Sequence, residues 1–78
     1  MPQKEFLSET ELASFAKQMR QKAGKKRAQA ARDMGVSQTS IFHAEESPEQ
    51  SLIKLRMRMI EAYSPFKVRG PVYLLEDK

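Results

Sequence analysis

The chain has 78 residues, a net charge of +4 and no cysteine. This length allows one domain, 1–78, with a marginal core, because so short a chain buries only about 60% of its unfolded surface. The absence of cysteine excludes a disulfide framework and a thiolate metal site, so association with a second copy is the expected source of extra stability. The positive charge favours an anionic partner.

Neither a membrane segment nor an export signal is evident. No apolar run approaches the roughly 18 residues that a bilayer span requires, and residues 1–7 lack the basic flank and apolar run of a signal peptide. We therefore expect a cytoplasmic protein with no membrane partner. The sequence also shows no nucleophile–base pair, carboxylate dyad, phosphate-binding glycine loop or metal-ligand cluster, so we expect no enzyme activity, no cofactor and no metal site.

The first predicted helix covers about residues 8–23. Ser8 and Glu11 have the spacing of a capping box, in which each side chain satisfies the backbone amide of the other residue. Apolar residues then recur at helical spacing from Leu12 to Ala23. Gly24 is expected to end the helix, because glycine adopts the left-handed conformation at little cost.

Two shorter helices are predicted over about 26–34 and 37–46. The apolar positions of the first are nearly all alanine, and Gly35 is expected to end it. Ser37 is expected to cap the helix at 37–46. Ile41 and Ala44 of this helix should face inward. The residues expected on its outer side are Gln38, Thr39, Phe42 and His43.

A fourth helix is predicted over about 48–63, because Ser47, Pro48 and Gln50 form a helix-start signal. It carries two apolar stripes. One could form core and the other part of a subunit interface, or both could form a single wide buried face. The first stripe is Leu52, Leu55, Met59 and Tyr63, and the second is Ile53, Met57 and Ile60.

The remaining tail, 66–76, is predicted to be strand-like. Ser64 and Pro65 stop the helix, residues 66–69 alternate apolar and polar, Gly70-Pro71 interrupts, and residues 72–75 are rich in strand formers. A single strand cannot satisfy its own backbone hydrogen bonds. Its partner could be 66–69, folded back as a hairpin, or the same tail of a second subunit.

Basic residues are concentrated just before and within the second predicted helix. From Lys17 to Arg32 there are seven lysines and arginines and no acid. Such a run can be a solvated surface, but its position beside two short helices joined by a glycine turn favours a nucleic-acid-binding face.

Five residues have the spacing of a known family: Ala31, Gly35, Val36, Ile41 and Glu45. On these residues the chain, from about Thr10 to Tyr63, resembles the lambda-repressor-like (Cro/CI, Xre-type) helix-turn-helix family. It departs from that pattern in the small Ala44 and the outward aromatic Phe42. The resemblance implies an all-α bundle of about four helices, here with a short C-terminal β-strand that could pair across a dimer.

The resemblance also implies how DNA would be bound. The family inserts the N-terminal end of the third helix into the major groove. The matching base-reading residues are Gln38, Thr39 and His43, which could contact adenine, a thymine methyl and a guanine acceptor respectively. Phe42, beside them, could pack on a thymine methyl or a sugar, or simply fill space against the fourth helix.

Phosphates are expected near helix N-termini, where free amides and the helix dipole favour anions. The candidate phosphate-binding residues are Lys25, Lys26, Arg27, Ser37, Ser40, Ser47, Gln50 and Ser51. The resemblance further implies a structural ion pair between Arg20 and Glu45. One-sided loss of a buried pair costs about 3–5 kcal/mol.

These observations predict a sequence-specific regulator of transcription that binds double-stranded DNA, a repressor acting as a homodimer on an inverted-repeat operator. An alternative is the antitoxin of a type II toxin–antitoxin pair, which binds a toxin protein and autoregulates its operon, because residues 10–24 and the tail resemble HipBA-type antitoxin subunits. A phage Cro-like or restriction-controller regulator would need no protein partner. An RNA binder is disfavoured, since the chain lacks the sheet-borne aromatics that stack on single-stranded bases.

Overall fold

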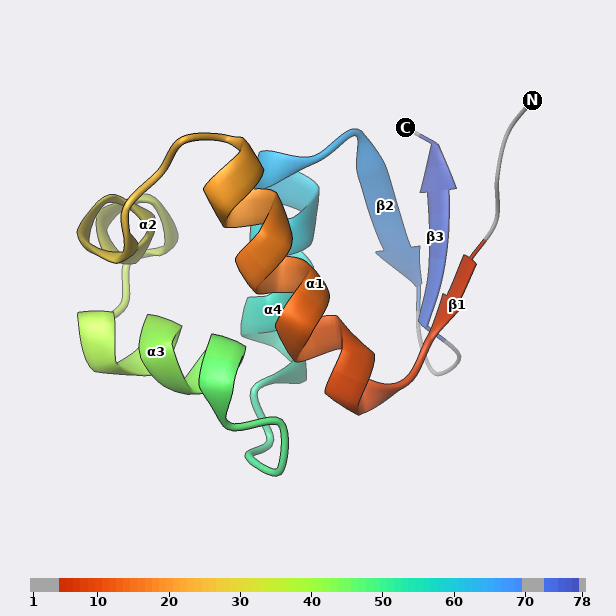
Figure 1. Cartoon of the computed structure of the whole chain (residues 1–78), viewed down its shortest axis with the longest axis horizontal. Coiled ribbons are helices and arrows are strands. Elements are labelled where there is room, and N and C mark those ends of the chain that lie inside the picture. Colours follow the sequence, from red (N-terminus) through yellow and green to blue (C-terminus); the bar gives the residue numbers. More distant parts are fainter. Residues whose placement is uncertain (1–4, 70–72, 78) are drawn as a thin grey trace.

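The computed structural model describes residues 5–69 and 73–77. They form a mostly helical structure in which α1 crosses α4 at the centre, α2 and α3 lie on one side, and a small sheet lies on the other (Figure 1). Within the described ranges, no helix is both long and apolar enough to cross a membrane. The elements are β1 (Glu5–Leu7), α1 (Glu9–Lys22), α2 (Arg27–Met34), α3 (Gln38–Glu46), α4 (Ile53–Tyr63), β2 (Phe66–Arg69) and β3 (Tyr73–Asp77).

The predicted start and end of α1 are both confirmed. The Glu11 amide donates to the Ser8 hydroxyl at 3.2 Å, and the Ser8 amide donates to the Glu11 carboxylate at 2.9 Å. The bond from the Ser8 amide lowers the pKa of Glu11. At the other end, Gly24 has a φ of 72°, the left-handed conformation that a glycine stop requires.

The core lies between α1 and the helices around it. Leu12 and Ala16 of α1 are fully buried, as are Met59 and Ile60 of α4. Met59 and Ile60 belong to the two different apolar stripes predicted for this helix, so the interpretation as one wide buried face is the better one. Ile53 and Met57, the rest of the second stripe, are half-buried against the same core. The second stripe therefore packs mainly against the core of its own chain.

The strands form a three-stranded antiparallel sheet of order β1-β3-β2. The chain is mostly helical, as predicted, but it contains more strand than the single C-terminal strand that was expected, and β1 was not predicted. Because β3 is central, both strands that pair with it come from the same chain. The hairpin interpretation of the tail is confirmed, and pairing of β3 across a dimer is not what the structure shows. Val68 of β2 and Leu75 of β3 are opposite each other and buried. The expected interruption at Gly70-Pro71 and the first strand residue, Val72, lie outside the described residues.

The predicted start of α4 at Pro48 was wrong, since this helix begins at Ile53. The Ser47 hydroxyl lies 2.9 Å from Nδ1 of His43, so it does not cap an amide of α4. The segment 47–52 is instead a loop held by the buried Arg56. Its guanidinium donates to the carbonyl oxygens of Ala44, Ser47 and Gln50 at 2.8, 2.7 and 2.9 Å. Arg56 thus ties the end of α3 and the following loop to α4.

Candidate nucleic-acid interface

The N-terminal end of α3 is anchored in the core on one side and exposed to solvent on the other. Gly35 ends α2 with φ 70° and ψ 36°, which reverses the chain. The Ser37 hydroxyl then caps α3 by accepting from the Ser40 amide at 3.1 Å, as predicted. Ile41 and Ala44 are fully buried, whereas Gln38 and Thr39 are exposed. Two of the three predicted base-reading side chains therefore project from a helix whose opposite side is anchored in the core.

His43, the third predicted base-reading residue, is half-buried and held by the loop after α3. Its Nδ1 lies 2.9 Å from the Ser47 hydroxyl and 3.3 Å from Nε2 of Gln50. An amide nitrogen can only donate, so Nδ1 accepts, and in the neutral ring the proton is on Nε2. Ser47 and Gln50, expected to bind phosphate, thus orient His43. The Nε2–H remains as the donor for an acceptor atom on a ligand.

Phe42 is the one large hydrophobic residue exposed in the described part of the chain, at 43%. Its ring meets the His43 ring edge-on at a centroid distance of 5.5 Å. The Arg27 guanidinium carbon lies 5.1 Å from the Phe42 centroid, within the range of a cation–π contact. These contacts place Phe42 between α2 and the outer side of α3, so its interpretation as filler against α4 is not supported.

The predicted pair of Arg20 and Glu45 is confirmed, and it is part of a larger network. Arg20 is 7% exposed and Glu45 is 4% exposed. Arg20 donates to both carboxylate oxygens of Glu45, and it also donates to the Lys25 carbonyl at 2.7 Å. Arg27 donates to Glu45 Oε1 at 3.0 Å. The buried carboxylate of Glu45 therefore orients the end of α1 and the start of α2, and Arg20 in turn holds the turn before α2.

Glu46, the next residue, forms a second and more exposed network that the sequence did not reveal. Its Oε2 lies 2.6 Å from Nζ of Lys17 and 2.8 Å from Nη2 of Arg27. The hydrogen bond from Lys17 lowers the pKa of Glu46. The Arg27 guanidinium, expected to hold a phosphate, is thus engaged by Glu45, Glu46 and the Phe42 ring. Only the run of positive charge around Lys17 could have drawn attention to this cluster.

Four of the other predicted phosphate residues lie in two places. Lys25 and Lys26 are exposed beside the start of α2, where Lys26 is the N-cap residue and makes no side-chain capping bond. Ser37 and Ser40 are close together at the start of α3, with hydroxyl oxygens 3.0 Å apart. Both places offer helix N-termini to an anion.

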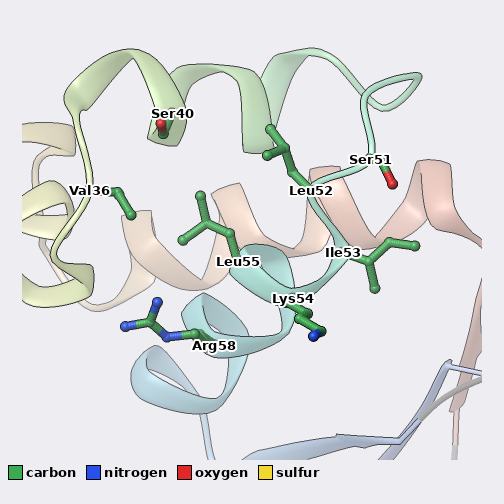
Figure 2. Close-up of a pocket in the computed structure, with 8 residues that line it drawn as sticks. All are labelled: Val36, Ser40, Ser51, Leu52, Ile53, Lys54, Leu55 and Arg58. Carbon is green, nitrogen blue, oxygen red and sulfur yellow. The ribbon is translucent and has the colours of Figure 1, made fainter.

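Ser51 lies at the edge of a groove of about 640 Å³ between α3 and α4 (Figure 2). Val36, Leu52 and Leu55 give the groove an apolar floor, and Ser40 reaches it from α3. Arg58 borders it and donates to the Met34 carbonyl at 2.9 Å, which fastens α4 to the end of α2. Ser51 is therefore separated from the Ser37–Ser40 pair by a groove, and it does not extend the α3 site directly.

Comparisons of the chain with protein-family models, with curated proteins and with solved structures gave no match.

Proposed function

We propose that this protein is a helix-turn-helix regulator of the lambda-repressor-like kind, which binds double-stranded DNA sequence-specifically, represses transcription and acts as a homodimer. The observation that carries the proposal is the end of α3, where Gln38 and Thr39 are exposed one turn from buried Ile41 and Ala44. A helix presented in this way, with short polar side chains at its N-terminal end, suits insertion into a major groove.

The residues around the N-terminal end of α3 are suited to contact with a DNA duplex. Thr39, Phe42 and His43 lie at helical spacings of three and four residues, so they share one face of α3. Two basic residues that precede α2, Lys25 and Lys26, are exposed at a second helix N-terminus. Phosphate contacts at the helix N-termini would position the protein, and the α3 side chains would select the sequence.

The first test is selection of bound duplexes from a random pool, followed by titration of the selected duplex. Gln38→Ala should weaken the selected complex by about 1–3 kcal/mol, because a bidentate contact to a base is lost, while binding to unrelated duplexes stays nearly the same. Gln21→Ala is the matched control, since Gln21 is an exposed glutamine on α1.

Footprinting of the selected duplex tests the dimer. We expect two protected half-sites, inverted and about 34 Å apart, because two recognition helices of a symmetric dimer must enter successive major grooves on one side of the DNA. A single unpaired half-site would contradict a dimer. Failure to bind any duplex, or equal losses from Gln38→Ala on every duplex, would contradict the proposed function or the base-reading role respectively.

A further inference from the structure

We propose that Lys17 and Arg27 form an additional DNA-phosphate site, and that the Glu46 carboxylate occupies this site in the free protein. The proposal rests on the function proposed above and adds to it. It assigns Lys17, on α1, to the DNA-binding surface and gives Glu46 the role of an internal competitor for that site.

The geometry at Glu46 is that of an occupied anion site. Lys17 from α1 and Arg27 from α2 converge on a single atom, Oε2 of Glu46, at 2.6 and 2.8 Å. An ammonium and a guanidinium directed at one oxygen are the donors that proteins use to bind phosphate oxygens. The carboxylate oxygen therefore stands where a phosphate oxygen of DNA would bind.

Glu46 also lies on the proposed DNA-binding face. It follows Thr39, Phe42 and His43 at seven, four and three residues, so all four lie on one side of α3. A duplex in contact with Thr39 would bring its negative backbone close to the Glu46 carboxylate. Like charges repel, so complex formation favours displacement of Glu46 from the two cations.

Lys17, Arg27 and Glu46 are partly exposed, so a phosphate can replace the Glu46 carboxylate. The side chains of Lys17, Arg27 and Glu46 are 36%, 33% and 34% exposed, and ion pairs at such positions contribute little to folding. Glu45, one residue earlier, is buried with Arg20 and cannot be released without cost to the fold. The two neighbouring carboxylates thus have different roles, one structural and one exchangeable.

The start of α2, to which Arg27 belongs, also favours a nearby anion. Arg27 is the first residue of this helix, and Lys26, its N-cap, makes no side-chain capping bond to the first-turn amides. These amides and the helix dipole favour negative charge. The Phe42 ring against the Arg27 guanidinium keeps that group near the surface after Glu46 has moved away.

The test is the salt dependence of DNA binding by the full chain, measured with both the selected duplex and an unrelated duplex. Glu46→Gln should tighten both complexes by about tenfold at low salt. The slope of log K against log salt should stay nearly the same, because Lys17 and Arg27 contact phosphates in both complexes once Glu46 is displaced. Glu49→Gln, the same charge change at an exposed loop residue, should leave both affinities nearly unchanged.

A second variant separates the cation site from a general charge effect. Adding Lys17→Met to Glu46→Gln should reduce the slope by about one unit, because one phosphate contact is lost, with the fold checked by circular dichroism. Equal effects of Glu46→Gln and Glu49→Gln would overturn the proposal while leaving DNA binding itself intact. A wild-type protein that binds neither duplex would instead remove the proposed function, so the two failures are distinguishable.

Discussion

Arg56 is expected to be the most sensitive residue of the domain outside its apolar core. It is fully buried, and it donates to three backbone carbonyls of α3 and the following loop, those of Ala44, Ser47 and Gln50. Hydrogen bonds to a charged group contribute about 1.5–3 kcal/mol each, and they do not simply add. Arg56→Met keeps the apolar stem and removes all three, so we expect a loss of about 3–5 kcal/mol.

That loss is large for a domain of this length. At roughly 0.05–0.15 kcal/mol per residue, its total stability is about 4–12 kcal/mol. Urea unfolding followed by circular dichroism measures the change, and the midpoint should fall by at least about 1 M. Arg58→Met is the matched control, because Arg58 is exposed and donates to one carbonyl, that of Met34; it should cost about 1 kcal/mol. Equal losses in the two variants would refute the role given to Arg56.

Two further predictions concern ionisable groups. Glu45→Ala should cost about 3–5 kcal/mol in urea unfolding, because it leaves the buried Arg20 without its carboxylate; a cost as small as that of an exposed glutamate would contradict the network. Burial and the 2.7 Å bond from the Tyr63 hydroxyl to Asp33 raise the pKa of Tyr63 to about 12. The protonated hydroxyl therefore stabilises the fold fully below about pH 10, and this contribution is lost as the pH rises towards 12. Tyr63→Phe should flatten the stability curve in that window, and an unchanged curve would exclude Tyr63 as its cause.

The features that could be predicted from the sequence are local ones. Three of them are the capping box of Ser8 and Glu11, the Gly35 turn and the Ser37 cap. Each depends on residues within four positions of one another, so it could be predicted from the sequence. The outward position of Gln38 and Thr39 follows from the same local periodicity.

The features that could not be predicted depend on residues distant in sequence. Ser47 and Pro48 look like a helix start, but the guanidinium of Arg56 holds this segment as a loop. β1 consists of only three residues and exists because it pairs with β3 near the other end of the chain. A strand that short carries too little periodicity to be recognised.

In the candidate site, too, the contacts between residues distant in sequence could not be predicted. Arg27 was expected to be available to a phosphate because of its position at a helix start, yet its partners are carboxylates on α3. Lys17 was known only as one charge in a basic run, and its pairing with Glu46 appears once α1 and α3 are packed together. Side-chain partners across helices are set by tertiary packing, which the spacing of residues along one helix does not determine.

If the proposed function is right, the N-terminal end of α3 enters the major groove of a duplex. The most direct measurement is a titration of isotope-labelled protein with the selected duplex, followed by amide chemical shifts in nuclear magnetic resonance spectra. We expect the largest shift changes at the amides of residues 37–43 and at the start of α2, with the amides of β2 nearly unchanged. Changes centred on the sheet, or no changes with any duplex, would contradict the proposed function.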